Sequence, residues 1–228
     1  MKLGLCLLTL NELEGCKLDV PRLPLSAFDE VFAMDGGSRD GTAEYLASAG
    51  IPVLRQSRRG YNLAYIEAFA HSSAEALVVY HPKGSIDPAT LLAFRPRFEA
   101  GADLVVASRI IRGAVNEEDG QLLKPRKWFV AGLALLSAAL WLRSGPMIWD
   151  VLHGFRGMRV DAFRAIGLTP EGLSADLEMV VAGYRLGLAL TEFPVTETPR
   201  PHGATHFKAL PTGWKLLKYL KAELLRRR

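Results

Sequence analysis

Short apolar runs that end abruptly in polar or glycine-rich turns recur along the chain. Residues 76–80, ALVVY, show this most clearly, because they have no polar alternation and are followed directly by His81 and PKGS. Such runs are typical of strands buried on both faces of a parallel sheet. Helical stretches alternate with these runs in the order of a nucleotide-binding half-sheet with right-handed crossovers. We predict strands at 3–10, 30–34, 51–54, 76–80, 103–107, 150–160 and 189–195, and helices at 43–49, 63–72, 88–100, 128–142, 161–166, 176–186 and 209–228.

Polar residues follow the first two predicted strands directly. The first strand ends in the sequence TLNE, and the second is followed by Asp35 and GGSRDGT. Helix capping accounts for Ser38 and Asp40 in that turn. Asp35 precedes the cap and sits where a carboxylate can accept a hydrogen bond from a base or a sugar.

The turn after residues 76–80 carries an imidazole and an ammonium group. Ligands of open α/β sheets bind outside the carboxyl ends of the strands, so we expect residues 81–85 to face the site. Asp87 and Pro88 are predicted as the cap and first residue of the next helix, where no amide donor is required. The chemistry of the site must therefore accommodate His81 and Lys83.

The regular alternation stops after the strand at 103–107. Residues 110–126 are charged and contain glycine, which predicts a mobile loop over the site. The longest apolar run follows at 128–142. Burial of this helix under the sheet is the favoured interpretation, and contact with a lipid is the alternative.

Composition bounds the class of protein. A chain of 228 residues with 49% hydrophobic content is expected to form a single domain. Two cysteines without metal or disulfide spacing favour a reduced, cytosolic setting. The first residues do not match a signal peptide, and the longest apolar run is shorter than the roughly 20 residues that cross a bilayer. We therefore expect a soluble or peripheral protein.

Much of the net charge of +4 comes from the predicted final helix, where basic residues alternate with leucines and aromatic residues. A basic amphipathic helix of this kind can lie on an anionic membrane surface or bind another acidic partner. Packing of its leucines on the core is an equally supported interpretation. Its aromatic residues recur at helical spacing rather than forming a stacking platform, so we expect no nucleic-acid partner.

Seven short motifs extend over nearly the whole chain, and their order and spacing are more specific than any one of them. They are LLTLNE (7–12), MDGGSRDGT (34–42), RRGYNLAY (58–65), KGSIDP (83–88), ASR (107–109), DVLHGFR (150–156) and RPHGATHFK (200–208). Together they resemble the family 2 glycosyltransferases of the GT-A fold, most closely the branch of dolichyl-phosphate mannose and polyprenyl-phosphate sugar synthases. This resemblance implies an α/β fold with a mixed, mostly parallel sheet and helices on both faces.

The resemblance also implies a reaction and its partners. A sugar would move, with inversion at the anomeric carbon, from a nucleotide-diphosphate sugar to a polyprenyl phosphate or another acceptor. Residues 1–109 would form the nucleotide-binding half, 110–208 the acceptor half with a closing loop, and 209–228 the basic helix. A membrane surface or a membrane-protein partner is a further candidate, which would place a cytoplasmic protein at the inner face of the membrane.

Individual residues receive roles from the same resemblance. Guanidinium groups of the closing loop would embrace the diphosphate, because they meet phosphate oxygens in a bidentate way. The implied nucleotide contacts are Thr9, Asn11, Glu12, Asp35, Arg59 and His81, the diphosphate contacts are Lys83, Arg200, Thr205 and Lys208, and the acceptor contacts are Arg109, Arg126, Asp150 and His153.

The motif after the central strand departs from the family pattern. In the family this strand ends in Asp-x-Asp, whose carboxylates hold a divalent metal on the diphosphate, whereas His81 and Lys83 occupy those positions here. An ammonium group repels Mg²⁺ or Mn²⁺, and one imidazole cannot replace the oxygen ligands that hard cations prefer. We therefore favour a site without a metal cofactor, with Mg²⁺ or Mn²⁺ as the alternative.

Two interpretations of this departure stay open. In the first, Lys83 neutralises the leaving diphosphate in place of the metal, which gives a metal-independent glycosyltransferase. In the second, the site is catalytically degenerate, and the protein binds a nucleotide or a partner without transfer.

The acid that activates an acceptor hydroxyl in many family members has two candidates here. Asp176 is the first and Glu178 the second, although a carboxylate at a helix N-terminus is explained equally well by the helix dipole. A polyprenyl phosphate is already ionised and needs no strong base.

Overall fold

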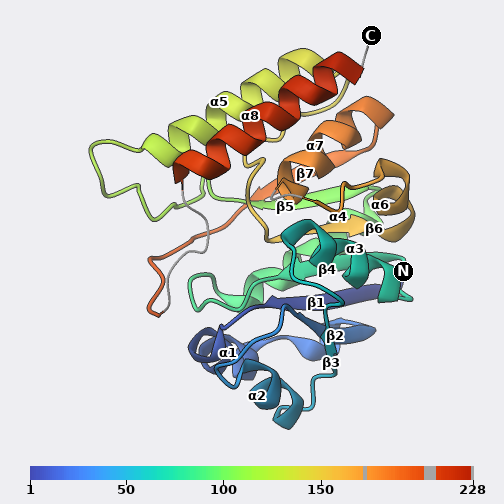
Figure 1. Ribbon diagram of the computed structural model, residues 1–228, viewed down its shortest axis with the longest axis vertical. Helices are drawn as coiled ribbons and strands as arrows, with labels where there is room; N and C mark the ends of the chain where they lie inside the picture. The colour runs from blue at the N-terminus through green and yellow to red at the C-terminus, as the bar shows by residue number, and fades with distance from the viewer. Residues whose placement is uncertain (172–173, 203–208, 227–228) are drawn as a thin grey trace.

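The computed structural model describes residues 1–171, 174–202 and 209–226. A sheet lies at the centre of this structure, with its strands stacked from the bottom to the middle of Figure 1. Its strands are β1 (Leu3–Thr9), β2 (Glu30–Asp35), β3 (Val53–Arg55), β4 (Ala76–Tyr80), β5 (Leu104–Ser108), β6 (Arg156–Arg159) and β7 (Leu190–Pro194).

The strand order is β3-β2-β1-β4-β6-β5-β7. Strand β6 runs antiparallel to both of its neighbours, β4 and β5, while the other pairs are parallel. The mixed, mostly parallel sheet expected from the sequence is therefore confirmed. Strands β1 and β4 are buried along their whole lengths, as continuous apolar runs require.

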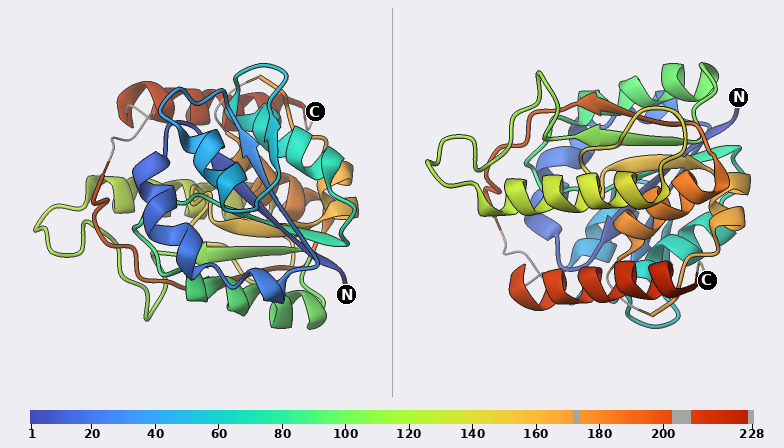
Figure 2. Two further views of the ribbon diagram at one scale, coloured as in Figure 1. Left: turned by 90° about the horizontal axis from the view of Figure 1, so that it is seen from below. Right: turned by 90° about the horizontal axis from the view of Figure 1, so that it is seen from above.

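Helices cover both faces of the sheet (Figure 2). They are α1 (Leu13–Asp19), α2 (Thr42–Ser48), α3 (Tyr61–His71), α4 (Phe94–Glu99), α5 (Pro125–Trp141), α6 (Val160–Ile166), α7 (Ala175–Leu186) and α8 (Ala209–Arg226), with short 3-10 turns η1 (Val20–Arg22), η2 (Leu25–Ala27) and η3 (Pro88–Ala93). One apolar core joins the sheet to α3, α5, α6, α7 and α8, and a second core joins its other face to α1, α2 and α4.

Several predicted boundaries were wrong. The helix predicted at 88–100 divides into η3 and α4, and Pro96 near the start of α4 has no N–H for a continuous α-helical ladder. The strand predicted at 150–160 is ordered as a strand only over 156–159, because residues 150–155 form turns that carry site residues instead.

The apolar helix at 128–142 is only half buried, which corrects the interpretation that it lies under the sheet. Helix α5 begins at Pro125 and buries Leu133 and Ala134, while Leu135 is 53% exposed on its outer side. Helix α8 likewise packs Leu216 into the core and leaves other apolar residues exposed. None of the described helices has the length and apolar character needed to cross a membrane.

Candidate active site

The carboxylate of Asp35 organises the loop after β2. Its Oδ1 accepts the N–H groups of Gly37 at 2.9 Å and Ser38 at 2.8 Å, and its Oδ2 accepts the hydroxyls of Thr9 at 3.0 Å and Ser38 at 2.5 Å. Asp35 is 3% exposed, so these bonds use its acceptor capacity inside the protein. In this structure Asp35 shapes the wall of the site, rather than presenting a free carboxylate to it.

The helix cap predicted beside this loop is corrected in part. Ser38 does not cap α2, because its hydroxyl bonds to Asp35 and accepts the N–H of Asn11 at 2.8 Å. Asp40 lies nearer the helix start, and its Oδ1 accepts the N–H of Thr42 at 3.1 Å.

An open pocket of about 470 Å³ lies beside the same loop. Its walls are formed by Asn11, Gly36, Gly37, Arg39, Arg55 and Arg59. Asn11 holds this wall in a left-handed conformation with φ 53°, and its side-chain oxygen accepts the N–H of Arg39 at 2.8 Å. Three guanidinium groups around one pocket favour a ligand rich in hydrogen-bond acceptors or negative charge.

Helix α1 fixes the turn that follows β4. Oδ2 of Asp19 accepts the Gly84 N–H and the Tyr80 hydroxyl, each at 2.9 Å, although Asp19 is fully buried. Gly15 allows this close approach, because a Cβ at that position would lie 2.2 Å from the Pro82 carbonyl oxygen. The turn with His81 and Lys83 is therefore held in place by its contacts with α1.

Lys83 is half-buried at the carboxyl end of β4, as expected. Burial, helped by the Arg200 guanidinium, lowers the pKa of Lys83 to about 8, against the opposing attraction of Glu197 and Glu12. Within the described part of the chain, no hydrogen bond or ion pair holds its ammonium group. An ammonium group without a protein partner, placed where ligands of α/β sheets bind, is suited to an anion.

Arg200 also reaches this end of the sheet. Its Nη2 lies 3.4 Å from Oε1 of Glu12, so the segment that contains Arg200 meets the chain just after the end of β1. The structure thus brings together Lys83, Glu12 and Arg200 from three distant segments. Thr205 and Lys208, the other predicted diphosphate contacts, lie outside the described residues.

His81 packs beside Gly154 and Tyr61. Its Nε2 is buried and has no hydrogen-bond partner among the described residues. Any side chain at position 154 would collide with it, since a Cβ there would lie 2.6 Å from Nε2 and 2.8 Å from the Tyr61 hydroxyl. Burial, with the Lys83 charge, shifts the pKa of His81 well below its usual range, so the imidazole is neutral at pH 7.

Asp176 lies on α7 at the centre of a buried polar cluster. It accepts the Tyr61 hydroxyl at 2.9 Å and the Tyr65 hydroxyl at 3.3 Å, and its Oδ1 lies 3.3 Å from Nε of Arg156. Burial raises the pKa of Asp176, and the Arg156 charge opposes that rise. Arg156 is fully buried, and its Nη2 has no hydrogen-bond partner among the described residues.

Glu178 has a structural role in the same helix. Its carboxylate accepts bonds from Asn62 at 2.9 Å and from the Thr169 N–H at 3.0 Å, and it also bonds the Ser174 hydroxyl. These contacts tie the start of α7 to α3. Of the two acidic candidates, Asp176 is therefore the one bonded to Tyr61, whose ring stacks on the His81 imidazole with 6.2 Å between the ring centroids.

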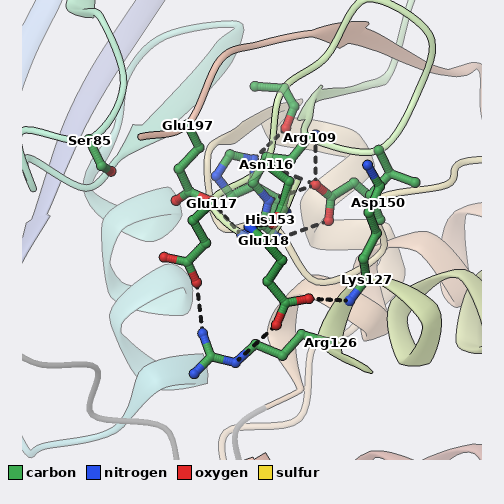
Figure 3. A network of polar contacts seen from close by, with 12 residues as sticks. Ser85, Arg109, Asn116, Glu117, Glu118, Arg126, Lys127, Asp150, His153 and Glu197 are labelled. Carbon is green, nitrogen blue, oxygen red and sulfur yellow. Dashed lines mark hydrogen bonds and ion pairs between the residues drawn. The ribbon is translucent and has the colours of Figure 1, made fainter. Parts of the chain in front are cut away.

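Three of the four predicted acceptor residues, Arg109, Asp150 and His153, form a second, closed cluster (Figure 3). Arg109 donates to both carboxylate oxygens of Asp150, at 2.8 and 3.0 Å, and to Glu197 at 3.1 Å. The Arg109 charge holds the pKa of buried Asp150 well below its usual range. Burial lowers the pKa of His153 to about 4, and its Nδ1 contacts the Ala107 carbonyl oxygen.

Arg126 lies apart from this cluster, at the start of α5. It pairs with Glu117 at 2.7 Å and with Glu118 at 3.8 Å, and its side chain is 60% exposed (Figure 3). The predicted acceptor residues are thus divided between a buried ion-pair cluster and the exposed start of α5.

The side chains at the end of β4 do not fit a divalent metal. A half-buried ammonium group and a buried imidazole offer no oxygen ligands to Mg²⁺ or Mn²⁺. Among residues 1–171, 174–202 and 209–226, no three His, Cys, Asp or Glu side chains converge in a way that could hold a metal ion.

Three residues of the site were not predicted from the sequence. Tyr61 and Arg156 lie inside the motifs RRGYNLAY and DVLHGFR, and Glu197 follows β7. An arginine between Phe155 and apolar strand residues was a usable signal, because a buried arginine needs acceptors around it. Glu197 carried no comparable signal.

A comparison with family models places the chain. Residues 21–167 match the model of glycosyl transferase family 2. Because this match extends over more than half of the sequence, the chain belongs to glycosyl transferase family 2, and the family resemblance found in its motifs is confirmed.

Curated relatives agree with this assignment. Glycosyltransferase AglJ of Haloferax volcanii is 27% identical over 204 residues, which cover 88% of this chain and 65% of that protein. Low-salt glycan biosynthesis hexosyltransferase Agl6 of the same organism is 24% identical, over 86% of this chain and 46% of that protein. Polyprenol monophosphomannose synthase of Mycolicibacterium smegmatis is 28% identical, over 86% of this chain and 77% of that protein. The chain thus spans about two thirds and about half of the two Haloferax proteins.

A solved structure confirms the GT-A fold. Glucosyl-3-phosphoglycerate synthase from Mycobacterium tuberculosis, in complex with Mn²⁺, UDP-glucose and phosphoglyceric acid, superposes with a TM-score of 0.74. The match covers 98% of this chain and 79% of that chain at 18% identity. Another structure of that enzyme contains Mg²⁺ and UDP. At this identity the likeness shows the fold alone.

Proposed function

We propose that this protein is an inverting glycosyltransferase that moves a sugar from a nucleotide-diphosphate sugar to a polyprenyl phosphate or another acceptor. The nucleoside would occupy the arginine-lined pocket beside Asn11 and Arg59, with Thr9 and Asp35 shaping its wall. Family membership and the name of the polyprenol monophosphomannose synthase relative support this reaction.

The observation that carries the proposal is the Lys83 ammonium group, half-buried and without a hydrogen-bond or ion-pair partner in the described chain. The family's Asp-x-Asp pair would fall at His81 and Lys83, so a cation of the protein would stand where the family holds a metal. Lys83 and Arg200, with Thr205 and Lys208 of the closing loop, would stabilise the charge that develops on the leaving diphosphate. Transfer would then proceed without Mg²⁺ or Mn²⁺.

The acceptor would enter between two clusters. Asp176 is linked to the His81 side of the site through Tyr61, and its raised pKa suits a group that takes a proton from an acceptor hydroxyl. A polyprenyl phosphate needs no such base and would use cationic contacts instead. Arg109, which lies beside Asp150 and His153, and Arg126, at the exposed start of α5, are the candidates.

A second candidate is a degenerate protein that binds a nucleotide without transfer. The observation that favours it is the saturation of Arg109, whose guanidinium group is already bound by Asp150 and Glu197. An acceptor phosphate would have to compete with both carboxylates.

Turnover in EDTA separates these functions. UDP-sugars and GDP-sugars are supplied with a polyprenyl phosphate, and sugar transfer is measured with and without added Mn²⁺. Transfer in EDTA at the rate seen with Mn²⁺ supports the proposal. Nucleotide binding without transfer under either condition supports the degenerate alternative, and transfer only with Mn²⁺ contradicts the role given to Lys83.

A further inference from the structure

The outer side of α5 presents a continuous apolar stripe. Trp128, Leu135 and Leu136 are 57%, 53% and 42% exposed, and Gly132 between them is exposed as well. No charged residue occurs from 128 to 142. A surface helix normally carries polar residues on its outer side, so this stripe is an exception that indicates a contact surface.

Helix α8 adds aromatic and basic groups next to this stripe. Trp214 is 62% exposed and Leu225 is 58% exposed. Lys215, Lys218 and Lys221 are exposed on the same helix, and the Lys218 ammonium lies 5.7 Å from the centre of the Trp214 ring. The outer surface of α8 is therefore both apolar and basic.

The two helices form one surface. They run side by side along the top of Figure 1, and both face the viewer in the right-hand view of Figure 2. Their starts meet where Gly213 approaches the Phe129 ring, since a Cβ there would lie 3.3 Å from it. Leu122 and Leu123, in the loop before α5, are 95% and 66% exposed. We call this surface, formed by residues 122–142 and 214–225, the α5–α8 face.

The positive charge of the α8 lysines favours an anionic surface over a second copy of this chain as the partner of the α5–α8 face. The only acidic residue of α8 is Glu223, which is buried and paired with Arg185. A symmetric contact between two copies would bring the α8 lysines of each copy to the same interface, where like charges repel. An anionic surface complements the lysines and accepts the apolar stripe at the same time.

The face is physically connected to the candidate site. Val115 exchanges backbone hydrogen bonds with the segment of Val195 and Glu197, and Glu197 pairs with Arg109. The same loop continues to Glu117, which pairs with Arg126 at the start of α5. A surface seated on α5 would therefore lie next to the predicted acceptor residues.

We propose that the α5–α8 face docks in the plane of an anionic lipid bilayer. Leucines and tryptophans enter the boundary between headgroups and acyl chains, and the lysines contact the anionic headgroups. This inference deepens the proposed function, because docking would present a lipid-linked phosphate to the acceptor side. Docking itself requires neither nucleotide nor turnover.

Vesicle co-sedimentation tests the docking. The protein is mixed with phosphatidylcholine vesicles or with vesicles that also contain phosphatidylglycerol, and tryptophan fluorescence is recorded in parallel. We expect binding to the anionic vesicles with a blue shift of the emission. Leu135→Glu should weaken this binding at least tenfold. Combined Lys218→Glu and Lys221→Glu should weaken it by about 25-fold or more, from about fivefold per lysine removed.

Leu92→Glu is the matched control, because Leu92 is also a leucine that is about half exposed, at 52%. It lies on η3, which packs in the second core with α1, α2 and α4 and is not part of the α5–α8 face. This variant should bind anionic vesicles as the unchanged protein does. Circular dichroism checks that each variant is folded, and the changes on α5 and on α8 test the face independently.

The proposal is overturned if anionic vesicles do not bind the protein, or if Leu135→Glu and the double lysine variant bind as well as the control. It is also overturned if sedimentation velocity shows a dimer that Leu135→Glu abolishes, because the face then binds a second copy. Vesicle binding without sugar transfer would reject the proposed function and leave the docking face intact. Transfer to a short, water-soluble polyprenyl phosphate without vesicle binding would do the reverse.

Discussion

The backbone N–H of Gly84 donates a hydrogen bond to Oδ2 of Asp19 over 2.9 Å. This bond ties the turn that carries Lys83 to helix α1, and Tyr80 donates to the same oxygen from the end of β4. We therefore predict that Asp19→Ala lowers the free energy of unfolding by about 1–3 kcal/mol, because it leaves buried donors unpaired. The same variant should weaken binding of a nucleotide-diphosphate sugar.

Asp161→Ala is the control for this change, because the Asp161 side chain is 96% exposed. It should alter the free energy of unfolding by less than about 0.5 kcal/mol in urea titrations. Unchanged stability and unchanged donor affinity in Asp19→Ala would show that α1 does not hold the turn.

The lowered pKa of Lys83 predicts a pH dependence of donor binding. Below pH of about 8 the ammonium form prevails in the free protein, and a bound diphosphate stabilises that form further. The pKa in the complex is then higher than in the free protein, so affinity should be greatest below pH 8 and should fall as pH rises above it. Titration calorimetry from pH 6.5 to 9.5 measures this, and Lys83→Met should remove the slope near pH 8. A flat profile in the unchanged protein would contradict the assignment.

Asp176→Asn distinguishes two classes of acceptor. The amide oxygen can still accept the Tyr61 hydroxyl, but the side chain can no longer take a proton. Transfer to an acceptor hydroxyl should fall by about 10²–10⁴-fold, whereas transfer to a polyprenyl phosphate should change much less. Steady-state rates with both acceptors check this, and equal losses with both would indicate that Asp176 only positions Arg156 and the tyrosines.

Loss of the buried carboxylate in Asp150→Ala should be costly. Arg109 would keep only Glu197 as an ionic partner, and breaking a buried pair costs about 3–5 kcal/mol of stability. Glu171→Ala breaks an exposed pair with Arg58 and should cost less than about 1 kcal/mol. Urea unfolding of both variants measures the difference, and similar small losses would mean that the Arg109 cluster adds little to stability.

Much of the fold was predictable because its strands follow simple patterns. Residues 76–80 are continuously apolar, and they form a strand that is buried throughout. The turn with Lys83 could likewise be placed at a strand end from the polar residues that follow. Residues 150–155 were harder, because apolar residues in their sequence resemble a strand while the structure uses them as turns.

The contacts of the site could not be predicted, because residue type does not show which neighbouring groups use up an acceptor, and because many contacts join segments far apart in the sequence. Asp35 was expected to face a base or a sugar, but the acceptors it offers are taken by Thr9, Gly37 and Ser38. Arg109 was expected to be open to a phosphate, and its partners Asp150 and Glu197 lie 41 and 88 residues further along the chain. Residue type alone does not encode which partners reach a charged group.

Calorimetry with UDP-sugars and GDP-sugars, in EDTA and in Mn²⁺, tests the role of Lys83 most directly. We expect equal affinity in both solutions, and a loss of about 10- to 100-fold in Lys83→Ala, from the strength of hydrogen bonds to charged groups. Lys17→Ala, which removes an exposed lysine paired with Glu14, is the control and should bind as the unchanged protein does. Binding that requires Mn²⁺, or full affinity in Lys83→Ala, would contradict a lysine in place of the metal.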